Sequence, residues 1–158
     1  MRRLTEEDAP FILRLLNEPS FIEFIGDRGV RSLDDAKTYL RAGPIASYQQ
    51  YGFGLYLLEL RERGVAVGIC GLLKREQLDH PDIGFSLLPE FWRQGYAREA
   101  AEAVMEYARE TLGLTRVLAI TSQQNERSAG LLDKLGFRFE RNIRMTPDGE
   151  ELKLFGAG

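Results

Sequence analysis

The stretch Leu88-Pro89-Glu90-Phe91-Trp92-Arg93-Gln94-Gly95-Tyr96-Ala97 joins a short apolar run to a long amphipathic one. The run before it, Ile83–Leu88, has the length of a buried strand and is closed by Pro89. From Gly95 to Thr111 alanines and larger apolar residues recur on one face, which predicts a helix. Free N–H groups at a helix start attract anions, and a glycine there lets a ligand approach the backbone. These residues alone fit either an anion site or an ordinary turn.

The flanking segments alternate between strand and helix patterns. Upstream, Phe53–Leu60 and Val65–Leu73 are β-rich runs joined by the turn Glu62-Arg63-Gly64. Before them, two helix-start signals introduce apolar stripes, and downstream a helix lies between short strands. The predicted helix starts are Thr5–Asp8 and Ser32–Asp35, with Pro19 ending the first helix; the later elements are a strand at Val117–Ile120, a helix from Asn125 to Leu135 closed by Gly136, and strands at Phe137–Met145 and Leu152–Phe155.

With a short first strand at Met1–Leu4, this order predicts an α/β fold with a mixed sheet of about seven strands and about four flanking helices. The helical crossover makes the strands at Ile83–Leu88 and Val117–Ile120 parallel, whereas hairpins make the other pairs antiparallel. No repeat or low-complexity linker divides the sequence. We therefore expect one domain over residues 1–158.

Composition excludes several classes of function. A net charge of −3 argues against a protein that binds duplex nucleic acid, and no apolar run reaches the twenty or so residues that span a bilayer. The N-terminus has no signal-peptide pattern. A single cysteine, Cys70, and a single histidine, His80, leave no internal disulfide and no thiolate or His-rich metal site. We expect a cytoplasmic protein that uses no metal and has no nucleic-acid or membrane partner.

The loop also resembles the pyrophosphate-binding motif of GNAT acetyltransferases, Q/R-x-x-G-x-G/A. Gly95 and Ala97 match its last two defined places, whereas Trp92 stands where the motif has Gln or Arg. A Trp at this place is similar to the RimJ/RimL-like branch of the family. Further segments match in order and spacing along nearly the whole chain: Leu15–Pro19, Gly68–Leu72, Asp82–Phe85, Asn125–Ser128 and Leu135–Phe137.

The resemblance implies a V-shaped opening between the two parallel strands, where the pantetheine of acetyl-CoA lies like an extra strand. Backbone groups near Leu87 and Leu88 would bond the pantetheine and polarise the thioester carbonyl as an oxyanion hole. Asn125 would contact pantetheine, and Ser128 would lie near the thiol. The pyrophosphate would be held by the loop and helix start, that is by Trp92, Arg93, Gln94, Gly95, Tyr96 and Ala97.

Two side chains are candidates for proton transfer. Many GNAT members have a tyrosine four residues before the closing glycine, but this chain has Leu132 there. Ser128 is then the candidate that serves the leaving thiolate; it is also an ordinary residue for the first turn of a capped helix. Asp82 aligns with an acidic residue that sometimes acts as a base through water, and equally fits a charge at a strand edge after Pro81.

The resemblance implies acetyl transfer from acetyl-CoA to a primary amine, on a peptide N-terminus or a small molecule, by a monomer or homodimer. The alternative is a non-catalytic acyl-CoA-binding module. We expect residues 21–31 and 146–151 to form the acceptor pocket. These segments hold both acids, which suit a cationic amine, and arginines, which suit a carboxylate or phosphate on the substrate: Glu23, Asp27, Asp148, Glu150 and Glu151 against Arg28, Arg31 and the nearby Arg144.

Overall fold

Seven strands form one sheet in the structure, a computed structural model that describes residues 1–158. The order across the sheet is β1-β2-β3-β4-β5-β7-β6, and every neighbouring pair is antiparallel except β4 and β5. This confirms the predicted mixed sheet and its parallel pair. The strands are β1 (Arg2–Arg3), β2 (Leu55–Glu59), β3 (Ala66–Leu73), β4 (Asp82–Leu87), β5 (Val117–Ser122), β6 (Arg138–Arg144) and β7 (Glu151–Ala157).

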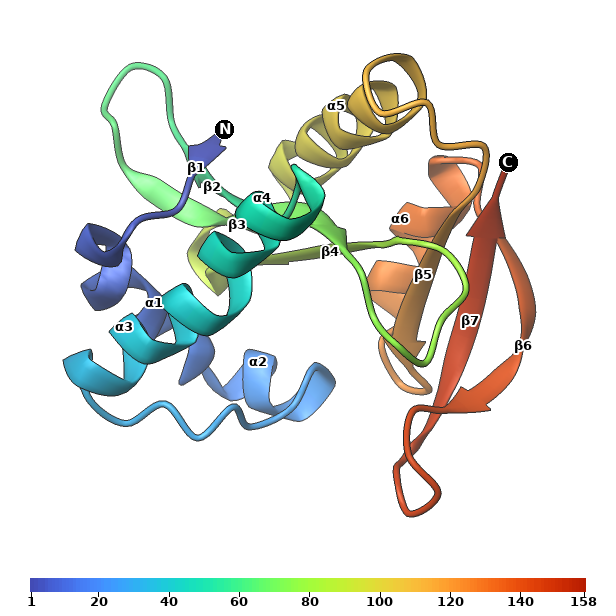
Figure 1. Cartoon of the computed structure of the whole chain (residues 1–158), viewed down its shortest axis with the longest axis horizontal. Coiled ribbons are helices and arrows are strands. Elements are labelled where there is room, and N and C mark those ends of the chain that lie inside the picture. The colour runs from blue at the N-terminus through green and yellow to red at the C-terminus, as the bar shows by residue number, and fades with distance from the viewer.

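Helices cover both faces of the sheet (Figure 1). The helix α5 (Tyr96–Glu110) packs Ala101, Val104 and Ala108 on one face, together with α6 (Glu126–Lys134). On the other face, α1 (Ala9–Leu16) and α3 (Leu33–Leu40) bury their apolar stripes against β2 and β3. No helix is both long and apolar enough to cross a bilayer.

The predicted helix signals act as expected at three places. Thr5 and Asp8 form a capping box before α1, with Thr5 N donating to Asp8 Oδ2 at 2.8 Å. Ser32 Oγ accepts from Asp35 N at 3.0 Å and begins α3. Gly136 has φ 91° and ends α6 in the left-handed region.

The N-terminal half contains helical turns that the sequence analysis did not anticipate. Pro19 lies after the end of α1, as predicted, and also occupies the first turn of a further helix, α2 (Pro19–Phe24). The pair Gly43-Pro44 does not end the helical path of the backbone. A π-helical turn (Arg41–Ile45) absorbs the proline and leads from α3 into α4 (Ala46–Tyr51). These turns form one wall of the cavity described below.

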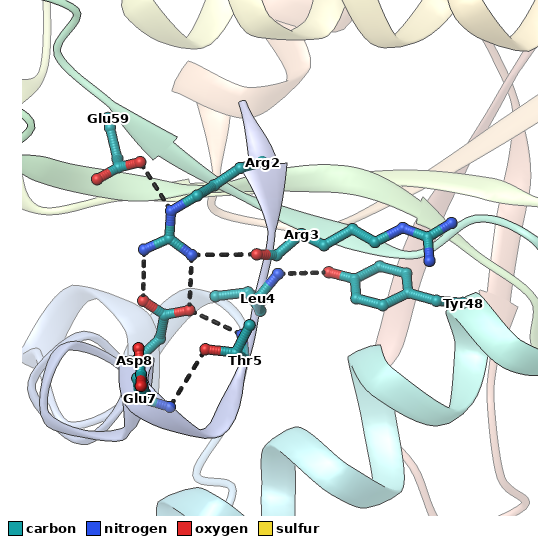
Figure 2. Close-up of polar contacts among 8 residues, drawn as sticks. All are labelled: Arg2, Arg3, Leu4, Thr5, Glu7, Asp8, Tyr48 and Glu59. Atoms are coloured by element: carbon teal, nitrogen blue, oxygen red, sulfur yellow. Dashed lines mark hydrogen bonds and ion pairs between the residues drawn. The ribbon is translucent and has the colours of Figure 1, made fainter.

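A polar cluster fastens β1 to the helical layer (Figure 2). Arg2 grips the buried carboxylate of Asp8 through both terminal nitrogens, at 2.8 and 3.0 Å, and donates from Nε to Glu59 at 2.8 Å. Because Thr5 N also donates to Asp8, the carboxylate is well supplied with donors. Burial alone would raise the pKa of Asp8, but the hydrogen bonds and charge of Arg2 and the Thr5 amide lower it.

The phenol of Tyr48 completes this cluster from α4. It accepts from Leu4 N at 2.9 Å and donates to the carbonyl of Leu55 (Leu4 and Tyr48 are drawn in Figure 2). Leu4 and Leu55 are buried, so their backbone groups depend on this hydroxyl for a partner.

Candidate functional site

The parallel strands β4 and β5 meet at one end only. Their single register pair is Asp82 with Leu118, and Leu118 N donates to Pro81 O at 2.9 Å. Beyond that pair the strands diverge, which confirms the predicted splayed pair. A cavity of about 740 Å³ opens there, bounded by β4, β5, the start of α6, the π-helical turn and α2.

Of the two residues whose backbone groups were predicted to bond the donor, the strand register leaves only Leu87 turned toward β5. Leu88 N donates to Val67 O at 2.9 Å, so the amide that we expected to polarise a thioester is already engaged. An antiparallel ladder bonds every second residue, and the β3–β4 register therefore turns the backbone groups of Phe85 and Leu87 toward β5. The Leu87 carbonyl accepts from Trp92 Nε1 at 3.0 Å. The amides on this side are thus those of Phe85, which lines the cavity, and of Leu87, which lies just beyond the lining residues.

The loop between β4 and α5 has an unusual backbone. Gly95 caps α5 with φ 84° and Arg93 has φ 63°, in a region that side-chain-bearing residues seldom adopt. A Cβ added at Gly95 would meet no atom within 4 Å, so the space before the helix is open. The first-turn amides, among them those of Tyr96 and Ala97, have no intrahelical acceptor. Arg93 and Gln94 are exposed beside this opening.

The side chain of Trp92 anchors this loop to β4 and to α6. Besides its hydrogen bond to Leu87, its ring is covered by the guanidinium of Arg127, with Cζ 3.8 Å from the ring centroid. Arg127 belongs to the first turn of α6. The loop that begins α5 and the start of α6 are therefore joined through one indole, a contact that the sequence analysis missed because it links residues 35 positions apart.

Asn125 and Ser128 lie together at the start of α6 and line the cavity. Asn125 Oδ1 accepts from Ser128 N at 3.2 Å, which confirms the expected cap. This bond uses the oxygen of Asn125 and leaves its Nδ2 available to a ligand. Leu132, one turn further, is 1% exposed and belongs to the core, so the place of the family's tyrosine holds a packing residue.

Asp82 is not a surface charge at a strand edge. It is 1% exposed, lines the cavity and accepts from Arg75 Nε, at 3.1 Å to one carboxylate oxygen and 3.2 Å to the other. Burial raises the pKa of Asp82 to about 6, although the charge and hydrogen bond of Arg75 work in the opposite direction. A carboxyl with this pKa changes its charge close to neutral pH.

Two hydroxyls at the end of β5 have no partner. Thr121 Oγ1 and Ser122 Oγ are buried and make no hydrogen bond, although both residues line the cavity. Buried hydroxyls without a protein partner are rare, so these two are candidate contacts for a polar ligand. The only signal in the sequence is two polar residues at the end of an apolar strand, four residues before Asn125.

Of the two segments that we expected to form the acceptor pocket, residues 21–31 contribute to the cavity lining and residues 146–151 do not. Phe21, Phe24, Ile25 and Arg28 line the cavity as expected, but the turn at 146–151 does not; only its neighbours Met145 and Leu152 reach it. The π-helical turn and the loop after β3 replace that turn. None of the five acids assigned to this wall, Glu23, Asp27, Asp148, Glu150 and Glu151, lines the cavity.

Comparison with known proteins is consistent with this site. A family model described as acetyltransferase (GNAT) domain matches residues 1–138. The uncharacterized N-acetyltransferase YoaA of Bacillus subtilis (strain 168) is 29% identical over 145 residues, which cover 91% of this chain and 81% of the relative.

Solved structures show the same fold. The acetyltransferase from Agrobacterium tumefaciens str. C58 is 25% identical, with a TM-score of 0.83 over 99% of this chain and 88% of that chain. RimL, a ribosomal alpha-N-protein acetyltransferase in complex with coenzyme A, is 17% identical, with a TM-score of 0.84 over 99% of this chain and 91% of that chain. The family model, the relative and the splayed strands agree, and the chain therefore belongs to the GNAT acetyltransferase family, whose general activity is acetyl transfer.

Proposed function

We propose that this chain transfers an acetyl group from acetyl-CoA to a primary amine by direct attack within a ternary complex. The observation that carries the proposal is the single register pair between β4 and β5, beyond which the strands part around a cavity. The unpaired hydroxyls of Thr121 and Ser122 and the open space before Gly95 fit an extended polar ligand with an anionic end. The similarity to RimL in its coenzyme A complex supports the same donor, and the Trp-containing loop supports the RimJ/RimL-like branch.

In this proposal the residues of the cleft bind and orient the donor. The amides at the start of α5 hold the pyrophosphate, aided by the helix dipole. The amides of Phe85 and Leu87 bond the pantetheine arm and stabilise the negative charge that develops on the carbonyl oxygen. Asn125 Nδ2 fixes the thioester beside them, because its oxygen is held by the cap. Trp92 keeps the loop and α6 in register.

Proton transfer falls to two groups in the same cavity. The amine attacks as its neutral form, a C–N bond forms and the C–S bond breaks. Asp82, ionised above about pH 6, takes the proton that the amine loses, directly or through water. Ser128 donates a hydrogen bond to the departing thiolate. Positioning of the two reactants contributes most of the rate, so losing either proton-transfer group slows turnover without abolishing it.

The first test separates positioning from folding at Asn125. Asn125→Asp keeps the capping oxygen at a helix N-terminus, where a carboxylate is favourable, but removes the Nδ2 donor. We expect Asn125→Asp to unfold at the wild-type urea midpoint while kcat/KM, followed by free-thiol release, falls at least about tenfold. Asn142→Asp, on an exposed strand away from the cavity, is the control.

The same assay separates an enzyme from a binding module. Wild-type protein is mixed with acetyl-CoA and a broad panel of peptide and small-molecule amines. Thiol release at the background rate with every amine, together with tight acetyl-CoA binding by calorimetry, would replace the proposal by the non-catalytic acyl-CoA-binding module.

A further inference from the structure

The charged side chains that line the cavity are mostly cationic. Four line it: Arg28, Lys74, Arg75 and Asp82. Asp82 pairs with Arg75, so two positive charges remain without a carboxylate inside the cavity, in a chain whose net charge is −3. The net charge of the cavity lining is therefore positive, whereas the net charge of the whole protein is negative.

Neither Arg28 nor Lys74 makes an ion pair within 4 Å, although the charge of Lys74 also acts on Asp82. Lys74 Nζ donates only to the backbone carbonyls of Arg75 and Leu78, at 3.3 and 3.2 Å. Arg28 makes no ion pair within 4 Å, although Arg31, three residues later, pairs with Asp27. The exposed side chain of Arg28 lines the cavity, and its guanidinium N–H groups make no hydrogen bond within the protein.

The positive charges of Arg28 and Arg75 both act on Tyr39. Its phenol comes from α3 and lines the same cavity. Burial raises the pKa of Tyr39, while the positive charges of Arg28 and Arg75 act on it in the opposite direction. The loop after α2, helix α3 and the loop after β3 thus each contribute a polar side chain to the lining of the same cavity.

We propose that the acceptor is a small-molecule amine that also carries a carboxylate or a phosphate, bound by Arg28 and Lys74, while Arg75 stays paired with Asp82. This inference rests on the proposed function and names the substrate class of its acceptor site. A small molecule is favoured over a protein because the anion subsite and Asp82 share one cavity of about 740 Å³. Apolar side chains, with Phe21 and Phe24 among them, complete the wall and suit an apolar body on the substrate.

Matched amines test the proposal with acetyl-CoA as the donor. Phenylalanine is compared with phenylalaninamide, and an aminoalkyl carboxylate is compared with the aminoalkyl phosphonate of equal length. Phenylalaninamide loses its proton more easily, so amine reactivity alone favours the neutral compound. We expect kcat/KM for phenylalanine to be at least about tenfold higher, through a lower KM. The second pair shows which anion the subsite prefers.

Substitutions assign the preference to residues. Arg28→Ala should raise KM for the anionic amine about tenfold with little change in kcat, and Arg28→Glu should reverse the preference between acid and amide. Arg31→Ala, on the same loop but outside the cavity and paired with Asp27, should leave both unchanged.

The outcomes separate this inference from the function on which it rests. If the amide or a neutral peptide N-terminus is acetylated as well as the acid, the anionic acceptor is wrong while the transferase stands. An acid preference that Arg28→Glu leaves intact also overturns the assignment of the subsite. If no amine reacts although acetyl-CoA binds, the proposed function itself fails.

Discussion

Two buried aspartates, each held by an arginine, behave in opposite ways. Asp8 receives two guanidinium nitrogens and a backbone amide, and its pKa is lowered. Asp82 receives a single nitrogen shared between its oxygens, lies deeper at 1% exposure, and has its pKa raised to about 6. Burial raises the pKa of both carboxyls; at Asp8 the donors outweigh it, whereas at the more deeply buried Asp82 they do not. In the N-terminal cluster the buried polar groups have hydrogen-bond partners, whereas in the cleft the buried hydroxyls of Thr121 and Ser122 have none.

The largest expected effect is on how stability depends on pH. For Asp82 the folded pKa lies above the unfolded value of 3.8, so the folded state holds the proton more tightly and stability falls as pH rises from about 4 to 7. That fall amounts to about 3 kcal/mol. Asp82→Asn removes it, so the variant should gain by this amount on the wild type across that range, measured by urea unfolding.

Asp8→Asn is the matched control for this experiment and should show the reverse. Its folded pKa is lowered, so its contribution is present above the unfolded pKa and is lost only as pH falls through the folded pKa. The deficit of Asp8→Asn should stay constant between pH 4 and 7 and shrink below pH 4. Parallel curves for the two variants would contradict the comparison.

A smaller effect is expected when the satisfied cluster loses a hydroxyl. Tyr48→Phe leaves the backbone groups of Leu4 and Leu55 buried without a partner and should cost about 2 kcal/mol of unfolding free energy. Tyr51→Phe, which alters an exposed ring in the same helix, should cost almost nothing. Equal losses for the two variants in urea titrations would show that the Tyr48 hydroxyl is not needed.

The smallest effect on stability is expected in the cleft. Thr121→Val removes a hydroxyl that has no partner and keeps its shape, so the unfolding free energy should change by less than about 0.5 kcal/mol. Activity should nevertheless fall, because the hydroxyl is available for a bound ligand. A stability loss above 1 kcal/mol by the same titration would mean that Thr121 already has a structural role.

The sequence predicts the parts of this structure that depend on local pattern. The strands, the parallel pair, the Asn125 cap and the left-handed Gly136 all follow from spacing and residue type. The π-helical turn is missed because Gly43-Pro44 has the composition of a helix end, and only packing keeps the path helical. The register of the strand pairs is missed as well, because it too is set by packing and not by local sequence.

Register distinguishes the two predicted oxyanion donors, Leu87 and Leu88. Only the pairing of Leu88 with Val67 shows that Phe85 and Leu87 face the cleft, and a shift of one residue would reverse this. The burial of Asp82 beside Arg75 and the contact of Arg127 with Trp92 are likewise set by tertiary structure. Sequence spacing located the candidate site, but not the chemical state of its groups.

The helical wall of the cavity has a consequence for how such a protein diversifies. In the proposed reaction, helix α2, the loop after it, the π-helical turn and the loop after β3 would supply the acceptor side, and the strands β4 and β5 with the start of α6 the donor side. None of these helical turns takes part in strand pairing. Exposed positions in these turns can therefore change, and recruit a new acceptor, while the buried face of α3 and the hydroxyl of Tyr48 keep the helical layer fastened to the sheet.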